Sequence, residues 1–212
     1  MNSTTLPRPS AIQARGLDPR LDIASPAAGI GLWVFMGTAG TLFLLFIAAY
    51  LMRMEGDDWS SLAMPWQLWL STALLVAGSA AMQWSYGSAR RGRWREARGR
   101  LWAGGACAWA FLGVQLWAWQ VLSAGHVVLA SNPAASFFYL LTALHGLHVA
   151  GGLIAWSVTA TGLWRQAAPV RAQQRIRLCA RYWHFLLLIW MALFATLAGL
   201  TPQVVRFICG TA

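Results

Sequence analysis

Five apolar runs, separated by short charged or turn-rich segments, dominate the 212-residue chain. The runs lie near residues 30–52, 67–87, 101–123, 136–158 and 184–207. A helix of about 20 apolar residues rises 1.5 Å per residue and so crosses the roughly 30 Å hydrocarbon core of a bilayer. The pattern therefore predicts an all-α membrane protein with five transmembrane helices in a single domain, residues 29–208.

Residues 1–28 differ from the rest of the chain because they contain no continuous apolar run. Pro7, Pro9, Pro19 and Pro26 interrupt this segment. A cleavable signal peptide needs a continuous apolar core, so the segment does not match one. We expect residues 1–28 to form a tail on the cytoplasmic side of the membrane.

The arginines predict the orientation of the chain. Fourteen of the sixteen basic residues, all of them arginine, lie in the tail and in the segments 88–100 and 159–183. The alternate segments contain only Arg53 and Arg206. Basic residues concentrate on the cytoplasmic side of membrane proteins, so the N-terminus is predicted to be cytoplasmic and the C-terminus outside. The same distribution accounts for the net charge of +10 without a nucleic-acid partner.

Four polar residues in or beside the apolar runs are candidates for a structural polar core. His145 and His148 are three residues apart and so share one side of a helix. Gln115 lies about 20 Å from the inner end of its helix, the same height as His145, which predicts a hydrogen bond between these two side chains. His184 is expected at the inner end of the last helix.

A metal or haem site is not expected in this chain. Two histidines at this spacing need further ligands, and no Asp or Glu lies inside any predicted helix. Cys107, Cys179 and Cys209 show no ligand spacing. We therefore expect no catalytic residue and no metal ligand here.

Three segments, in the order of the predicted helices, resemble a known family. They are Gly31-Leu-Trp-Val-Phe35 with Ala48-Ala-Tyr50, then Phe137-Phe-Tyr with His145-Gly-Leu-His148 and Gly151-Gly152, and finally Tyr182-Trp-His-Phe185 followed by Trp190. Together they resemble the five-helix form of cytochrome c oxidase subunit III, over about residues 29–200.

The chain departs from the family pattern at three positions inside the membrane. The family has acidic residues where this chain has Ala39, Ala118 and Leu187. The predicted bundle does not depend on these acids, whereas any proton-handling or lipid-ordering role of theirs would be lost.

The resemblance implies a non-catalytic accessory subunit of a bacterial haem–copper terminal oxidase, in the inner (plasma) membrane. Haem and copper would belong to the catalytic partner, subunit I, and subunits II and IV are further expected partners. The subunit would stabilise the catalytic subunit and hold structural phospholipids. The lipid-binding candidates are Arg165, Trp183, His184 and Trp33.

Three alternatives remain at this point. The first is an accessory subunit of a nitric oxide reductase, or of another branch of the same superfamily. The second is a small transporter, although such proteins usually place polar groups at broken helices in mid-membrane. The third is a membrane enzyme with a dihistidine metal site.

Overall fold

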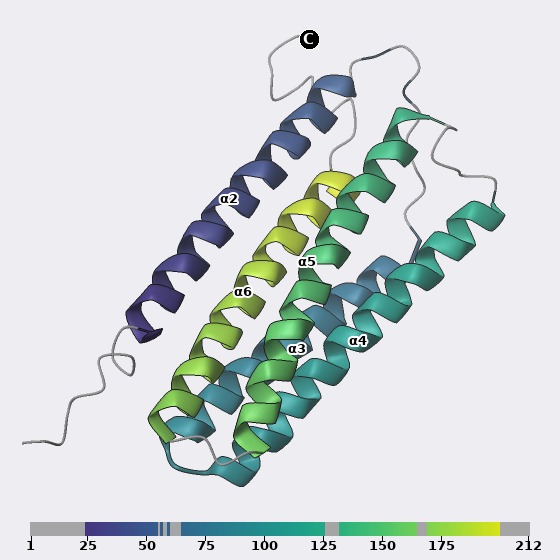
Figure 1. Cartoon of the computed structure of the whole chain (residues 1–212). Helices are drawn as coiled ribbons and strands as arrows, with labels where there is room; N and C mark the ends of the chain where they lie inside the picture. The colour runs from purple at the N-terminus through teal and green to yellow at the C-terminus, as the bar shows by residue number, and fades with distance from the viewer. Residues whose placement is uncertain are drawn as a thin grey trace, which may run out of the picture.

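The computed structural model describes residues 24–54, 56, 59, 65–125, 132–164 and 169–199. These residues form five long helices. The helices are α2 (Ala24–Arg53), α3 (Gln67–Arg90), α4 (Trp94–Ala124), α5 (Pro133–Trp164) and α6 (Pro169–Gly199). Figure 1 shows α3, α4, α5 and α6 packed as a bundle, with α2 standing to one side along α6 and α5.

The prediction of five helices is confirmed, but three predicted starts are wrong. The last helix begins at Pro169 rather than at 184, α4 begins at Trp94 rather than at 101, and α2 begins at Ala24 rather than at 30. An apolar run marks the part of a helix that lies in hydrocarbon, whereas the helix itself continues into the polar end of the bundle. Arginine favours helix formation and proline suits the first helical position, so the basic segment before residue 184 is helical too.

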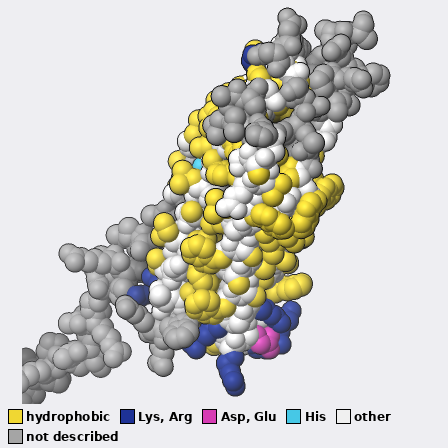
Figure 2. Space-filling model, turned by 90° about the vertical axis from the view of Figure 1, so that its right-hand side faces the viewer, with side chains coloured by type: hydrophobic (Ala, Val, Ile, Leu, Met, Phe, Trp, Pro, Cys, Tyr) yellow, Lys and Arg dark blue, Asp and Glu magenta, His cyan; other side chains and the backbone are white. Residues whose placement is uncertain are grey.

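Four of the five helices are long and apolar enough to span a membrane. They are α4 and α6 over their whole lengths, α2 from Ala28 and α5 as far as Leu163. Helix α3 is not among them, although it lies within the same bundle. Figure 2 shows hydrophobic side chains over the flank of the molecule and arginines gathered at one end.

Contacts of arginine and glutamate lie along the first turns of α4 and join this helix to α5 at the basic end. Glu96 pairs with Arg93 at 3.1 Å and with Arg100 at 3.3 Å. Arg98 Nη2 donates to the carbonyl oxygen of Leu163 at 2.9 Å, so α4 caps the C-terminus of α5. Gly92 makes the α3–α4 turn with a φ of 72°, a conformation that glycine adopts without strain.

Trp183 of α6 fills the centre of the bundle between two glycines. A Cβ atom on Gly78 of α3 would lie 3.6 Å from Trp183 Nε1, and one on Gly152 of α5 would lie 3.0 Å from Trp183 Cζ3. The indole is 1% exposed. Small residues in facing helices allow this close approach.

Gly105 of α4 gives a direct test of this packing. The ring of Trp156 occupies the space where a Cβ atom of Gly105 would be. The ring cannot easily move, because Trp156 Nε1 donates to the carbonyl oxygen of Leu101 at 2.8 Å. We expect Gly105→Ala to lower the free energy of unfolding by about 1–3 kcal/mol, as overpacking does.

The matched control is Gly113→Ala on the same helix, where nothing lies within 4 Å of the added Cβ. This change should be neutral or stabilise the helix by about 0.5–1 kcal/mol. Unfolding in mixed detergent, followed by circular dichroism, measures both variants. Equal stability of the two would contradict the packing described for Trp156.

Candidate functional site

His145 lies at the centre of the bundle and is completely buried. Three aromatic rings surround its imidazole: Trp190 at 5.1 Å, Phe111 at 5.6 Å and Phe43 at 6.3 Å between ring centroids. Neither ring nitrogen has a hydrogen-bond partner among the described residues. The imidazole is therefore placed by aromatic packing, including edge-on contacts with Phe111 and Phe43.

The predicted hydrogen bond between Gln115 and His145 is wrong. Gln115 Nε2 donates instead to the hydroxyl oxygen of Ser71 on α3, at 3.0 Å, and its Oε1 has no partner among the described residues. Residues at equal height can lie on different sides of their helices. Here Gln115 turns toward α3, and it is Phe111, one turn earlier on α4, that meets His145.

His148 lies on the same side of α5 as His145 but faces α2. Its ring is 5.3 Å from that of Phe43 and 5.9 Å from that of Phe35. Its Nδ1 donates to the carbonyl oxygen of Leu144 at 2.8 Å, so the ring is anchored to its own helix. Tyr182 of α6 donates to the His148 carbonyl oxygen at 3.0 Å, which ties α5 to α6.

His184 lies in the middle of α6 and not at its inner end, because this helix begins fifteen residues earlier, at Pro169. The side chain is exposed on the surface formed by α3 and α6. Its Nδ1 is hydrogen-bonded to the hydroxyl of Ser79, and its Nε2 lies 3.1 Å from Gln83 Oε1. His184 is thus separate from the buried His145 and the half-buried His148 of α5.

No group of three or more His, Cys, Asp or Glu side chains that could hold a metal ion occurs within the described ranges. Ala39 and Ala118 are buried and Leu187 is half-buried. These three positions therefore lie in or beside the apolar packing of the bundle.

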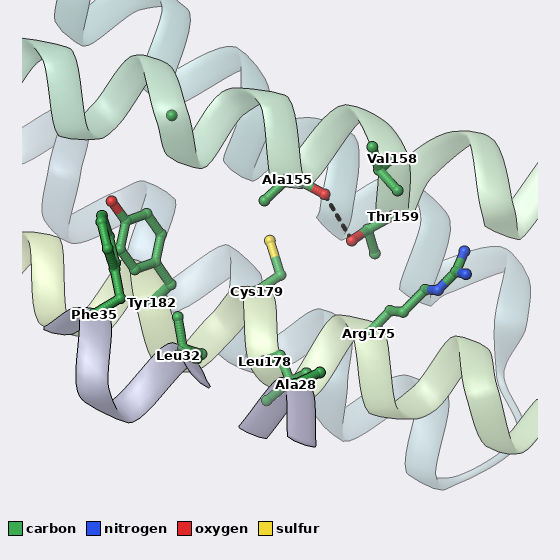
Figure 3. A pocket seen from close by; sticks show the side chains of 11 residues that line it. Ala28, Leu32, Phe35, Ala155, Val158, Thr159, Arg175, Leu178, Cys179 and Tyr182 are labelled. Carbon is green, nitrogen blue, oxygen red and sulfur yellow. Dashed lines mark hydrogen bonds between the residues drawn. The ribbon is translucent and has the colours of Figure 1, made fainter. Parts of the chain in front are cut away.

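A groove opens between α2, α5 and α6, with a volume of about 470 Å³. Its walls are mostly apolar and include Leu32 and Phe35 of α2 and Ala155 of α5. Figure 3 shows Arg175 at one end, with Tyr182 and Phe35 at the other. Thr159 adds a hydroxyl to the wall, although that hydroxyl already donates to the Ala155 carbonyl oxygen.

The sequence-based lipid candidates fall in different places. Trp33 is 59% exposed and lies 5.3 Å under the Arg181 guanidinium, at the surface of α2 and α6. Trp183 is buried in the core, so its ring does not face the membrane. Arg165 lies outside the described residues.

Arg175 is a groove residue that the apolar runs do not predict, because they leave residues 159–183 outside the predicted helices. The spacing carries a signal nonetheless: Arg175, Cys179 and Tyr182 stand at i, i+4 and i+7, so one side of a helix carries all three.

Comparison with known proteins confirms the predicted resemblance. The family model described as cytochrome c oxidase subunit III matches residues 30–199. The chain is 29% identical to the cytochrome c oxidase subunit 3 of Thermostichus vulcanus, over 81% of this chain and 87% of that protein. It is 27% identical to the cytochrome bo(3) ubiquinol oxidase subunit 3 of Pseudomonas aeruginosa, over 77% of this chain and 80% of that protein.

The hydrogen bond between Gln115 and Ser71 can be tested with a double-mutant cycle. The variants Gln115→Leu and Ser71→Ala should show a coupling free energy of about 0.6 kcal/mol, and no more than about 1.7 kcal/mol, as interhelical hydrogen bonds in membranes do. Unfolding in mixed detergent gives the four free energies of the cycle.

The matched cycle pairs Gln115→Leu with His145→Phe. Its coupling should be smaller, because these two side chains share no hydrogen bond. A larger coupling for Gln115 with His145 than with Ser71 would contradict the arrangement described here.

Proposed function

Because the chain belongs to the cytochrome c oxidase subunit III family, we propose that it is a non-catalytic accessory subunit of a bacterial haem–copper terminal oxidase. It binds the catalytic subunit, subunit I, which holds the haem and copper, and it stabilises that subunit in the plasma membrane during aerobic respiration. Subunits II and IV are further partners in this proposal.

The extent of the family match supports this proposal most strongly. The match over 30–199 takes in nearly the whole of α2 and all of α3 to α6. No described helix is left over for a separate activity. The names of the relatives include a cytochrome c oxidase and a ubiquinol oxidase, so the proposal covers either electron donor.

The distribution of arginines supports the proposed orientation. The α3–α4 turn and the first half of α6 carry most of the described arginines, and Arg53 lies at the opposite end. We place the arginine-rich end and the N-terminus on the cytoplasmic side, following the positive-inside rule.

The groove between α2, α5 and α6 is the proposed site of a structural phospholipid. An acyl chain would lie against the apolar walls, and Arg175 would meet the phosphate at the arginine-rich end. The guanidinium has no acidic partner among the described residues. Arginine binds phosphate oxygens with two parallel hydrogen bonds, and Trp33 beside Arg181 would cover the neighbouring surface.

Co-purification tests the proposed role. The affinity-tagged chain, extracted from its native membrane in a mild detergent, should bring with it a haem-containing subunit, visible as a Soret band. The same chain produced without partners should show no such band. A chain that purifies from native membranes without any haem protein would contradict the proposal, and so would a haem band from the chain alone.

The lipid site gives a separate prediction. Arg175→Gln should weaken retention of anionic phospholipid about fivefold, since one arginine near an anionic lipid contributes about 1 kcal/mol. Arg177→Gln is the control, because it removes the same charge two residues away, outside the groove lining. Native mass spectrometry of the purified protein counts the retained lipids. Equal lipid loss in both variants would show that the groove does not select the headgroup.

A further inference from the structure

Exposed polar side chains in the helices of this protein differ in how they are hydrogen-bonded. The hydroxyls of Thr38, Thr41 and Thr161 donate to carbonyl oxygens of their own helices, four residues earlier. A hydroxyl bonded in this way can face lipid at little cost, because its donor is satisfied. His184 and Gln83 differ, since both are exposed and they bond to each other across α6 and α3.

Ser79, His184 and Gln83 form a directed chain of hydrogen bonds. The amide oxygen of Gln83 can only accept, so His184 Nε2 carries the proton and donates to it over 3.1 Å. His184 Nδ1 then accepts from the hydroxyl of Ser79. The chain ends at the amide nitrogen of Gln83, which has two N–H donors on the exposed side of the bundle.

These donors lie at the height of His184, in the middle of α6, which is long and apolar enough to span a membrane. Gln83 precedes Arg90 by seven residues, which is about 10 Å along α3. An unpaired N–H group costs several kcal/mol in lipid. Polar groups at such depths therefore usually face protein or a water-filled cavity.

We propose that this surface is where the catalytic subunit docks, through a transmembrane helix that presents a hydrogen-bond acceptor to the Gln83 amide. The inference rests on the proposed function and names the face and the chemistry of the contact. The docking face consists of Val76, Gln83 and Trp84 of α3 with His184 and Leu188 of α6, all of them exposed.

The geometry favours a different chain over a second copy of this one. In a twofold dimer through the docking face each Gln83 would offer two N–H donors but only one remaining acceptor site, because its oxygen already accepts from His184. A partner that supplies further carbonyl, carboxylate or hydroxyl oxygens can satisfy both donors. The exposed alanine Ala77 and the half-buried Ala80 lie on the same side of α3 and leave room for a helix to approach.

Gln83→Leu in the assembled complex tests the contact. The variant should lose about threefold in the amount of haem subunit that co-purifies, the usual effect of one interhelical hydrogen bond. Its own fold should be retained, because the side chain is on the surface. Gln120→Leu is the matched control, since Gln120 is also exposed but lies on α4, and it should leave co-purification unchanged. Equal yields of the haem subunit from Gln83→Leu and the parent would overturn the contact.

A photocrosslinking amino acid at position 84 or at position 147 locates the face. Trp84 and Leu147 are 62% and 67% exposed, on α3 and α5 respectively. Mass spectrometry should find adducts with the catalytic subunit from position 84, and lipid adducts from position 147. Adducts from position 84 with lipid alone, or with another copy of this chain, would overturn the docking face.

The two proposals can fail separately. If the parent chain does not co-purify with a haem subunit, the proposed function is wrong. If it does co-purify but crosslinks to the catalytic subunit only from position 147, the docking face alone is wrong.

Discussion

Hydrocarbon offers no hydrogen-bond partner, so polar side chains in these helices depend on partners inside the protein, although His145 has none among the described residues. Helix α3 shows how the bundle meets this constraint. Its hydroxyl groups contact the neighbouring helices along its whole length. The contacts are Ser71 with Gln115, Thr72 with Trp190, Ser79 with His184, Ser85 with the Ala97 carbonyl oxygen and Ser88 with Arg100. These bonds join α3 to α4 on one side and to α6 on the other.

Helix α3 is not among the helices apolar enough to span a membrane, yet it packs most extensively against its neighbours. The row of hydroxyl contacts explains both properties. The buried side of α3 includes Ser71, Ser79, Ser85 and Ser88, which lower its apolar character. The same small residues allow α4 and α6 to approach closely. Helix α2 is the opposite case: it is strongly apolar, much of its apolar surface is exposed, and its main contacts within the described residues are with α5 and α6. Helices α2 and α3 each pack against two others, so polarity in this bundle follows how extensively a helix packs and not how many helices it contacts.

The apolar runs were enough to predict five helices and the burial of His145, because hydrocarbon length and the cost of a polar group at depth are properties of the sequence itself. They do not predict how far a helix continues beyond its apolar run, so they place His184 at a helix end and leave Arg175 outside the predicted helices. Gln115 was assigned the wrong partner because height along a helix is fixed by residue number, whereas direction depends on how the helices are rotated against one another. That rotation is set by packing, here by Phe111 and Trp190 around His145.

Helix α6 has three sides, and each side faces different surroundings. One side packs Trp183 and Trp190 into the core, a second carries Arg175 and Tyr182 into the groove beside α2, and a third exposes His184 and Leu188 next to α3. Because a helix turns by 100° per residue, neighbours such as Trp183 and His184 necessarily face different surroundings. The groove and the docking face are consequently separated by the width of α6. A lipid in the groove and a protein partner on the docking face would therefore not compete for the same surface of α6. Each could stabilise the packing of α6 against the helices around it.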